Sequence, residues 1–399
     1  MNAVDILTSH NKFHINLGLK RISAILALLN NPQDNYKIIH VAGTNGKGST
    51  SKIINEILIT EGYNTGLFTS PHLFSYTERI QVNNEKISDD LFDELVKKID
   101  NLAIKNNIEL SEFELITAVG FYYFSLKKVD YIVLEVGLGG LYDATNVVKK
   151  STSVITTIDY DHTERLGKTI NEIAIQKAGI IKQDCPVVIS PQNAGYSAIH
   201  KIIEEKNAKI IELSDIKISF EDKNYAIINN EKYEFNLLGE HQAQNLALAL
   251  GAIKSLNIKI NKETIKKALK TVTWHFRLEY LKEKNILIDS AHNPNGAKVL
   301  KEFLNKNFKI KKTFIFGCLK NKEYEKMLDT LIEKDDVFYF YEFDYPNALK
   351  FNELPKKYQA QKISNIQEIE EIIKKDKNLK IFCGSIYMLG KLFKEIKLN

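Results

Sequence analysis

A stretch near the N-terminus joins an apolar strand to a helix through a glycine-rich turn, and few folds accommodate that connection. We expect a strand over Tyr36 to Ala42, a turn over Gly43 to Thr50 and an amphipathic helix over Lys52 to Thr60. Free N–H groups at a helix start, together with the positive end of the helix dipole, favour a bound anion. Lys47 adds a mobile positive charge, and the hydroxyl of Ser49 or Thr50 can meet Mg²⁺ or a phosphate oxygen. The stretch therefore predicts a site for the phosphates of ATP.

The turn does not have the standard P-loop spacing. Val41 stands where the first glycine of G-x-x-x-x-G-K-[ST] belongs, and Gly48 follows Lys47. The alternative is an ordinary glycine-rich turn between a strand and a helix. Turn chemistry alone does not require a lysine at this place, so phosphate binding is the favoured interpretation.

Length and charge narrow the class of protein. With 399 residues and 44% hydrophobic content, the chain can bury a sizeable core in two domains. The formal charge is +5, and the lysines are scattered among 50 acidic residues, so we expect no nucleic-acid partner. Only four of the 55 basic residues are arginines, which suggests that Arg79 and Arg277 were needed as planar, bidentate groups.

Cysteine usage and hydropathy indicate the compartment. Cys185, Cys318 and Cys383 are far apart and form no C-x-x-C pair, so neither a disulfide framework nor a zinc site is expected. The start, Met1 to Lys12, lacks a signal-peptide apolar run, and no later segment approaches about 18 uninterrupted apolar residues. We expect a cytoplasmic protein without a membrane anchor.

Strand-like runs alternate with helical periods along most of the chain. This alternation predicts an α/β fold whose first sheet is mostly parallel, of P-loop type, with helices on both faces. The expected strands after the turn are Asn64 to Thr69, Asp130 to Val136, Ser153 to Asp159, Cys185 to Ser190 and Lys209 to Leu213. The expected helices are Asp89 to Lys105, Glu112 to Leu126 and Gln242 to Ser255.

The pattern changes twice in the second half. Short alternating runs between Ile216 and Phe235, around Asn229-Asn230, predict a small antiparallel excursion. The helical pattern breaks near Val272 to Leu278, and we place a domain boundary there, giving an ATP-binding domain over 1–272 and a smaller, Rossmann-like α/β domain over 273–399. The expected elements of the second domain are strands Ile286 to Ala291, Thr313 to Gly317, Val337 to Phe343 and Leu379 to Gly384, and helix Asn295 to Asn305.

Polar side chains follow several expected strands. Glu135 ends one strand and precedes a glycine-rich segment, Val136 to Gly140; Ser70, in Ser70-Pro71-His72, follows another. The carboxyl ends of parallel strands meet at the crevice where the phosphate loop opens, so both side chains are candidate Mg²⁺ ligands. The alternatives are a salt bridge from Glu135 to a lysine and a simple proline turn at Ser70.

Two further clusters have the same placement. His162 lies in the polar segment that follows the strand Ser153 to Asp159, although a lone loop histidine is more often a surface residue. In the second domain, Asp289 and His292 follow the strand Ile286 to Ala291, where an acid suits a ribose hydroxyl and a histidine suits phosphate or substrate. An aspartate helix cap is the alternative at Asp289.

In order and spacing, these stretches resemble the folylpolyglutamate synthase and dihydrofolate synthase family of the Mur-ligase superfamily. The resemblance covers nearly the whole chain. Its motifs are Ile15 to Arg21, Gly43 to Ser49, Thr69 to Leu73, Leu134 to Gly140, Asp143 to Asn146, Asp161 to Thr163, Gln176 to Ile180, His241 to Asn245, Arg277 to Glu279, Asp289 to Pro294 and Cys383 to Ser385.

The resemblance implies roles for individual residues. Composition alone would make Lys177 one more solvated helix lysine, but it matches the family's carbamylated lysine, and a carbamate converts the cation into a carboxylate-like anion. The implied ATP ligands are Thr44, Asn45, Gly46, Lys47, Gly48, Ser49, Asn245, Arg277 and Asp289. The implied ligands of two Mg²⁺ ions are Ser70, Glu135 and His162, and the implied catalytic residues are Lys47, Glu135, His162 and Lys177. The implied substrate-side residues are Phe113, Glu114, Asp143, Ala144 and His292.

The activity implied by the resemblance is ATP-dependent addition of L-glutamate to dihydropteroate, to folate or to both, through an acyl phosphate. We expect a monomer whose partners are these small molecules. One alternative is another Mur-superfamily ligase, although cell-wall members carry a further domain before the phosphate loop and only about forty residues precede it here. The other is a nucleotide-gated binding protein, which would leave Glu135, His162 and Lys177 without a joint role.

Overall fold

The computed structural model describes residues 2–10, 18–214, 216–222 and 225–396 of the chain. The motif residues Ile15 to Leu17 lie outside the described residues. The chain divides into two compact units, and Val272 and Thr273 mark the main boundary between them. The short segments Phe220–Asn224 and Asn236–His241 group with the second unit.

The first unit is built on an eight-stranded sheet in the order β4-β3-β2-β5-β1-β6-β7-β8. The strands from β2 to β8 in this order are parallel, and β3 and β4 continue the sheet antiparallel at one edge, so the predicted mostly parallel sheet is confirmed. The strands are β1 (Lys37–Ala42), β2 (Thr65–Phe68), β3 (Ile80–Val82), β4 (Glu85–Lys86), β5 (Tyr131–Glu135), β6 (Thr152–Ile155), β7 (Pro186–Ile189) and β8 (Lys209–Ile210).

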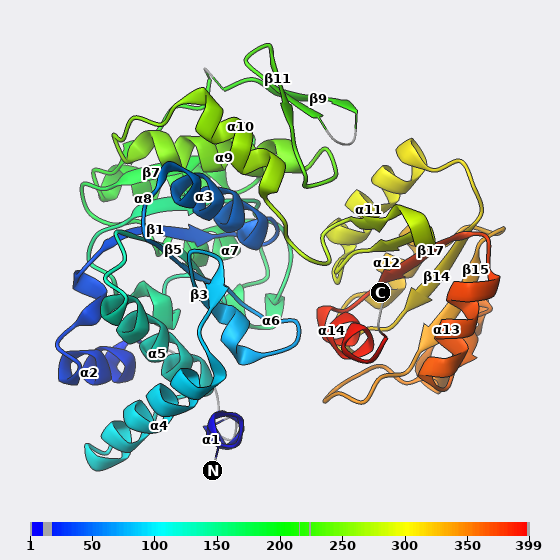
Figure 1. Ribbon diagram of the computed structural model, residues 1–399, viewed down its shortest axis with the longest axis horizontal. Coiled ribbons are helices and arrows are strands. Elements are labelled where there is room, and N and C mark those ends of the chain that lie inside the picture. The colour runs from blue at the N-terminus through cyan, green and yellow to red at the C-terminus, as the bar shows by residue number, and fades with distance from the viewer. Residues whose placement is uncertain (1, 11–17, 215, 223–224, 397–399) are drawn as a thin grey trace. The chain divides into compact units, whose positions relative to one another are not determined.

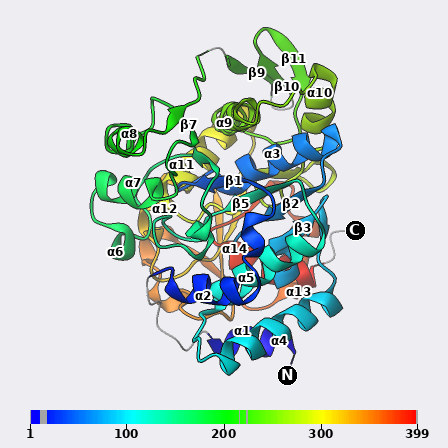
Figure 2. The same cartoon turned by 90° about the vertical axis from the view of Figure 1, so that its left-hand side faces the viewer.

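Helices cover both faces of this sheet, so its central strands are buried on both sides, as their continuous apolar runs indicate. One face packs on α3 and α9, and the other packs on α4, α5, α7 and α8 (Figures 1 and 2). The helices are α1 (Ala3–His10), α2 (Lys20–Leu28), α3 (Lys47–Glu61), α4 (Asp89–Lys105), α5 (Glu112–Leu126), α6 (Thr163–Leu166), α7 (Ile170–Ala178), α8 (Tyr196–Glu205), α9 (Gln242–Ser255) and α10 (Lys262–Thr271).

The helix after the phosphate loop differs from the prediction. It begins at Lys47, not near Lys52, and it is not amphipathic, because every residue from Gly48 to Leu58 is buried. The reason is its position: α3 packs on the strands β1, β2 and β5, and the helices α9 and α10 cover its other sides. Some polar residues on α3 find partners inside the unit, as where the ammonium group of Lys52 donates to Asn84 Oδ1 at 2.5 Å. The buried hydroxyl groups of Thr50 and Ser51 have no hydrogen-bond partner among the described residues.

The predicted antiparallel excursion is present as a three-stranded sheet in the order β11-β10-β9. Asn229 and Asn230 have φ angles of 50° and 68°, the left-handed values that a tight hairpin turn requires. The strands are β9 (Ile218–Asp222), β10 (Tyr225–Ile228) and β11 (Glu231–Glu234).

The second unit contains a six-stranded sheet in the order β12-β13-β17-β14-β15-β16. All strands are parallel except β12 at one edge, which agrees with the predicted smaller α/β fold. The strands are β12 (Glu279–Leu281), β13 (Ile286–Ile288), β14 (Lys312–Phe316), β15 (Val337–Tyr341), β16 (Gln361–Ile363) and β17 (Leu379–Cys383). The helices are α11 (Pro294–Asn307), α12 (Tyr324–Leu331), α13 (Ile366–Lys375) and α14 (Ile386–Glu395).

Aromatic side chains dominate the core of this unit. Phe314 and Phe316 on β14 are fully buried under α11 and α12, and on α14 the ring of Phe393 contacts Phe382 with centroids 5.2 Å apart. None of the helices in the part of the chain that the structure describes has the length and apolarity that a membrane span requires.

One close contact gives a test of the packing between sheet and helix in the first unit. A Cβ atom added at Gly66 on β2 would lie 2.7 Å from a ring carbon of Phe124 on α5. We expect Gly66→Ala to lower the free energy of unfolding by about 1–3 kcal/mol, the usual cost of overpacking. Unfolding followed by circular dichroism measures this.

The double variant Gly66→Ala/Phe124→Leu is the matched control, because the smaller side chain makes room for the added methyl group. We expect its destabilisation to be less than the sum of the two single variants. Strict additivity would contradict the described contact.

Candidate active site

The phosphate loop lies at the carboxyl edge of the first sheet, between β1 and α3 (Figure 1). Gly46 is the N-cap of α3 with a φ angle of 86°, a left-handed value that favours glycine. A Cβ at Gly43 would lie 1.7 Å from Thr156 Oγ1, so the loop backbone packs directly on a side chain that follows β6. The loop is therefore a rigid, close-packed turn.

Two threonines that sequence analysis did not single out brace this loop. Thr156 Oγ1 donates to the carbonyl of Asn45 at 2.8 Å, and the Asn45 N–H donates to Thr157 Oγ1 at 3.0 Å. The Thr44 N–H donates to the carbonyl of Thr157 at 2.7 Å. The signal in the sequence was a pair of hydroxyl residues at the end of a buried strand, a position that faces the phosphate loop in a parallel sheet.

The N-terminus of α3 and Lys47 supply positive charge at the loop. Lys47 folds back so that its ammonium group donates to the carbonyls of Gly43 and Thr44, both at 3.1 Å. Gly48 and Ser49 form the first turn of the helix, where backbone N–H groups lack helical partners. These groups and the helix dipole make the loop an anion site.

Asn245 lies beside the same loop. It sits in the first turn of α9, and a Cβ added at Gly46 would lie 2.3 Å from its Oδ1 atom. Its amide group donates to Gln242 Oε1 at 2.8 Å, which fixes the orientation of the side chain. The structure thus brings Asn245 to the six predicted ATP ligands of the loop.

Lys177 has surroundings that composition alone would not suggest. It is 4% exposed, not solvated, and its ammonium group donates to the carbonyl of Gly43 at 2.8 Å. Burial, and secondarily the charge of Lys47, lowers the pKa of Lys177 from 10.5 to about 7. Two lysines that are 130 residues apart in the chain therefore donate to one carbonyl oxygen.

The predicted metal ligands Glu135 and Ser70 come together. Glu135 is the last residue of β5, and its Oε2 atom accepts a hydrogen bond from the Ser70 N–H at 3.2 Å. Ser70 follows β2, the neighbouring strand, so the parallel register places both at one edge. Among the described residues, no group of three or more His, Cys, Asp or Glu side chains is arranged to hold a metal.

His162 lies beyond β6, which ends earlier than predicted, at Ile155. It is the N-cap residue of α6, with a φ angle of 49°, and its imidazole lies 3.8 Å from Asp161 and 3.7 Å from Glu164. Its side chain is 36% exposed. The ring is therefore accessible and surrounded by carboxylates.

The predicted substrate-side residues Phe113 and Glu114 open helix α5. The ring of Phe113 lies against Gly137, where an added Cβ would be 2.4 Å from Cζ. Glu114 forms a capping box with Ser111, and its Oε2 atom accepts from Arg21 Nε at 3.1 Å. Its Oε1 atom is buried without a hydrogen-bond partner among the described residues.

Asp143 and Ala144 are buried beneath the glycine-rich segment that follows Glu135. Asp143 accepts hydrogen bonds from the Leu138 and Thr145 N–H groups at 2.8 Å and 3.0 Å. Burial raises the pKa of Asp143, while these hydrogen bonds oppose the shift. The Asp143 carboxylate is thus hydrogen-bonded to the backbone around it.

The glycine-rich segment packs tightly on α7. A Cβ at Gly140 would lie 2.8 Å from the carbonyl of Lys177, and a Cβ at Gly179 would lie 2.4 Å from Leu141 Cα. Next to this contact, Tyr142 is 48% exposed. Backbone thus meets backbone here without intervening side chains.

A histidine and an arginine near Ser70 were not selected as site residues. Arg79 Nε donates to His72 Nδ1 at 3.0 Å, and the ring of His72 lies 4.4 Å from that of Tyr76. Burial, and secondarily the charge of Arg79, lowers the pKa of His72 to about 3. His72 is therefore neutral, with its proton on Nε2. The sequence feature that could have pointed to this pair is the presence of one of only four arginines, Arg79, shortly after the segment Ser70-Pro71-His72.

Three predicted site residues belong to the second unit. Asp289 follows β13, and it accepts from the N–H groups of Leu278 at 2.9 Å and Ala291 at 2.8 Å. Burial raises the pKa of Asp289, and the charge of Arg277 opposes the shift. His292 Nδ1 lies 2.9 Å from the carbonyl of Ser290.

The helix-cap alternative for Asp289 is wrong. Asn293 is the N-cap of α11, and its side chain accepts from the Gly296 N–H at 2.8 Å. The strand was expected to run to Ala291 but ends at Ile288, so Asp289 lies in the connecting loop.

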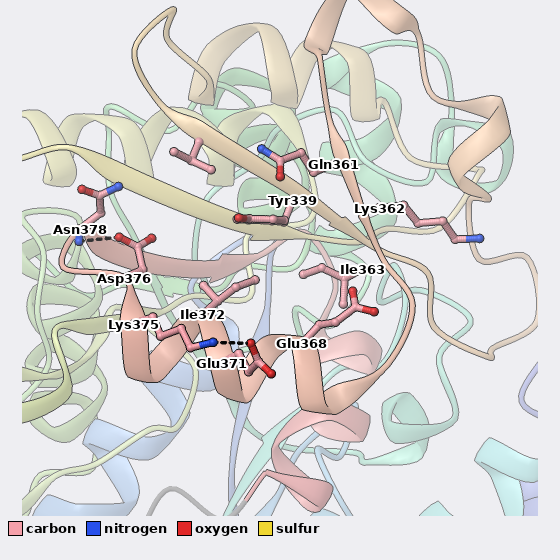
Figure 3. Close-up of a pocket in the computed structure, with 11 residues that line it drawn as sticks. Tyr339, Gln361, Lys362, Ile363, Glu368, Glu371, Ile372, Lys375, Asp376 and Asn378 are labelled. Carbon is pink, nitrogen blue, oxygen red and sulfur yellow. Dashed lines mark hydrogen bonds and ion pairs between the residues drawn. The ribbon is translucent and has the colours of Figure 1, made fainter.

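A groove of about 560 Å³ lies elsewhere on the second unit, between α13 and the strands β15 and β16 (Figure 3). Tyr339 and Ile372 contribute to its lining, and the ion pair of Lys375 with Glu371 crosses one side at 2.7 Å. No predicted site residue lines it.

Comparisons with known proteins agree with the placement of both units. The Mur ligase middle domain matches residues 41–253, and the Mur ligase glutamate ligase domain matches residues 276–382. The dihydrofolate synthase/folylpolyglutamate synthase of Bacillus subtilis is 34% identical to the chain over 419 residues, covering 97% of this chain and 96% of that protein.

Solved structures with bound ligands are also similar. The bifunctional folylpolyglutamate synthase/dihydrofolate synthase of Yersinia pestis, complexed with AMPPNP and Mn ion, matches with a TM-score of 0.88 and 26% identity, over 98% of its length and 99% of this chain. Escherichia coli FolC, in complex with DHPP and ADP, matches with a TM-score of 0.86 and 25% identity, over 97% of its length and 99% of this chain.

The family model of the middle domain spans more than half of the chain, and the Bacillus subtilis relative aligns over nearly its full length. The chain therefore belongs to the folylpolyglutamate synthase and dihydrofolate synthase family of Mur ligases.

Proposed function

We propose that the chain is an ADP-forming ligase that joins L-glutamate to a pteroate or folate carboxylate at the expense of ATP. The observation that carries the proposal is the meeting of Lys47 and Lys177 at the Gly43 carbonyl, beside the phosphate loop. The relatives and solved structures named above support the reaction and its nucleotide.

The reaction needs an activated acid, because a carboxylate is a poor electrophile for an amine. The γ-phosphoryl group of ATP passes to the substrate carboxylate, and ADP leaves. The amino group of glutamate then attacks the acyl phosphate, so an amide forms and phosphate leaves. Catalysis of such a transfer is mostly positioning and charge neutralisation, which Lys47 and the start of α3 are placed to supply.

The proposed ATP ligands are divided between the units. In the first unit, residues 44–49 hold the phosphates and Asn245 contacts adenine; in the second, Arg277 and Asp289 contact phosphate and ribose. We accordingly propose that 1–272 is the ATP-binding domain and 273–399 the C-terminal ligase domain.

Glu135, Ser70 and His162 suit Mg²⁺ rather than a protein-enclosed metal. Mg²⁺ is typically held by one or two carboxylates together with substrate phosphates and water, and Glu135 with the adjacent Ser70 offers such a partial ligand set. His162 adds an accessible ring among carboxylates. Two bound ions would neutralise the charge that develops on the transferred phosphoryl group.

The buried amine of Lys177, with its lowered pKa, suits carbamylation. Only an unprotonated amine attacks CO₂, and a pKa of about 7 leaves much of Lys177 unprotonated at neutral pH. The resulting carbamate would carry negative charge beside Lys47, converting a repulsive pair of cations into an attractive pair of opposite charges.

Phe113 and Glu114 are proposed on the pterin side, with Asp143 and Ala144 beneath the adjoining loop, and His292 of the second unit is proposed to face phosphate or substrate. The ring of Phe113 provides an apolar surface against Gly137. The Glu114 Oε1 atom, which has no hydrogen-bond partner among the described residues, is a candidate acceptor for a donor group of a ligand. These features favour an aromatic, hydrogen-bonding acid as the substrate.

A nucleotide-gated binding protein is the second candidate. It would bind ATP through the same loop but release no ADP in response to glutamate. The combination of Lys177 with Glu135 gives no advantage to such a protein, whereas it serves phosphoryl transfer.

We propose a monomeric, cytoplasmic enzyme whose partners are its small-molecule substrates. The three cysteines are buried free thiols, which fits a reducing compartment.

Substrate choice is tested by phosphate release. We expect purified protein with ATP, Mg²⁺ and glutamate to release phosphate when dihydropteroate or tetrahydrofolate is supplied, because the acid must be activated first. The two acids are supplied separately, which establishes whether one or both are substrates. Equal release without glutamate would contradict ligation and favour the binding protein.

Lys47→Ala removes the charge that faces the phosphates. We expect turnover to be lost, with unchanged circular dichroism, because Lys47 is only half-buried and contacts loop carbonyls. Glutamate-dependent ADP release measures the effect. Lys266→Ala on α10 is the matched control, since that exposed lysine pairs only at 3.8 Å with Glu263, and it should retain normal turnover. Normal turnover in Lys47→Ala would overturn the phosphate-loop assignment.

Carbamylation of Lys177 predicts a response to bicarbonate. As pH rises through about 7, more of the amine loses its proton, so enzyme depleted of CO₂ should regain turnover faster at pH 8 than at pH 6 when bicarbonate is added in amounts that give the same concentration of dissolved CO₂ at both pH values. Lys177→Ala should lose most turnover and all of this response.

Lys182→Ala is the control for that experiment, because Lys182 is another partly buried lysine with a lowered pKa, about 8. Its variant should keep the bicarbonate response. Loss of the response in Lys182→Ala, with retention in Lys177→Ala, would show that the carbamate forms on Lys182 and would contradict its assignment to Lys177.

A further inference from the structure

A buried chain of hydrogen bonds runs beneath the glycine-rich segment Gly137 to Gly140, which we call the glycine loop. It starts at His40 on β1, whose Nε2 atom lies 2.9 Å from Thr145 Oγ1. Thr145 Oγ1 in turn lies 2.5 Å from Asp143 Oδ1. His40 and Thr145 are fully buried. The family resemblance assigned no role to His40 or Thr145.

With Asp143 ionised, the protons in this chain have one consistent arrangement. An ionised Asp143 only accepts hydrogen bonds, so the single hydroxyl proton of Thr145 points to Oδ1. The hydroxyl oxygen must then accept from His40, which places the proton of a neutral imidazole on Nε2. This agrees with His40 Nδ1, which is buried without a hydrogen-bond partner among the described residues and is better left without a proton.

The far end of the chain holds the glycine loop. Asp143 Oδ2 accepts from the Leu138 N–H at 2.8 Å, and the Asp143 N–H donates to the carbonyl of Gly140 at 3.2 Å. Two hydrogen bonds to Asp143 therefore hold the backbone of the loop, one at Leu138 and one at Gly140.

The neighbours of the glycine loop are site residues. Its first residue, Gly137, contacts the ring of Phe113, and its last, Gly140, contacts the backbone of Lys177. Glu135 lies two residues before it. A shift of this loop would therefore change the positions of Phe113 and Lys177 relative to Glu135.

We propose that His40, Thr145 and Asp143 form a positioning unit that fixes the glycine loop between Phe113 and Lys177. Only the expected effect on kcat rests on the proposed ligase activity. Asp143 in this arrangement acts on the loop backbone and not on the substrate, which differs from the role implied by the family resemblance. Neither His40 nor Thr145 touches a reacting atom.

The unit differs from ordinary core packing in its chemistry. A fully buried strand position on this face suits an apolar side chain, and a histidine there leaves one ring nitrogen unpaired at a free-energy cost. The cost is consistent with a positioning role, because the hydrogen bond from His40 orients the Thr145 hydroxyl toward Asp143. Outer-shell hydrogen bonds of this kind commonly tune a site by holding the groups next to it.

Thr145→Val removes the hydroxyl with little change of shape. We expect kcat for glutamate ligation to fall about ten- to one-hundredfold, the usual effect of removing an outer-shell partner. The affinity for ADP should change less than twofold, because the phosphate loop is held by Thr156 and Thr157 instead. Thr145→Ser keeps the hydroxyl and should restore most of kcat.

Thr152→Val is the matched control. Thr152 is a buried threonine on β6 whose hydroxyl lies 2.9 Å from Ser255 Oγ, away from the glycine loop. Its loss should affect stability without the loss of kcat. If Thr145→Val fails to fold because a buried N–H of His40 is left unpaired, the double variant His40→Leu/Thr145→Val removes both polar groups and carries the same kinetic test.

Two readouts do not depend on ligase activity. In ¹⁵N NMR spectra of labelled wild-type protein, His40 should carry its proton on Nε2, and a proton on Nδ1 would overturn the chain as described. Hydrogen exchange at the Leu138 amide should accelerate at least tenfold in Thr145→Val and return toward wild type in Thr145→Ser.

The outcomes separate the two proposals. If the wild-type protein shows no ligation with any acid tested, the proposed function fails, while NMR and hydrogen exchange still decide whether the unit holds the loop. If ligation occurs and Thr145→Val matches Thr152→Val in both kcat and Leu138 exchange, the positioning unit is rejected.

Discussion

The site depends on the absence of a side chain at Gly43. Because nothing projects from this residue, the hydroxyl of Thr156 packs against the loop backbone, and the loop carbonyl remains open to two ammonium groups. Lys47 comes from the helix that follows the loop, and Lys177 comes from a helix far along the chain. The parallel sheet then brings Glu135 and Ser70 to the same edge. One steric constraint thus underlies the charge distribution of the first unit.

Much of the fold follows from the sequence because its determinants are local. Apolar runs and helical periods predicted both sheets, and the ends of strands predicted the neighbouring positions of Glu135 and Ser70, since parallel strands share an edge. The prediction for α3 was wrong in one respect: polar residues such as Lys52 and Glu56 suggested a solvated face, whereas α9 and α10 cover it. Periodicity cannot reveal a helix that is covered later by distant segments.

The electrostatic features of the site could not be predicted in the same way. The burial of Lys177 and its contact with Gly43 join residues that are remote in sequence, and only family resemblance had selected this lysine. The same holds for the chain from His40 to Asp143. It arises when the sheet forms, so residue type and spacing carry no direct signal for it.

The contact between Gly140, Gly179 and Leu141 has a consequence for how the protein can change. Main chain abuts main chain there, so any bulkier residue at either glycine would push α7 and its lysine aside. Tyr142, immediately next to this contact, is half exposed. Packing therefore leaves that side chain open to exchange, while neither glycine can be replaced without moving the main chain that it touches.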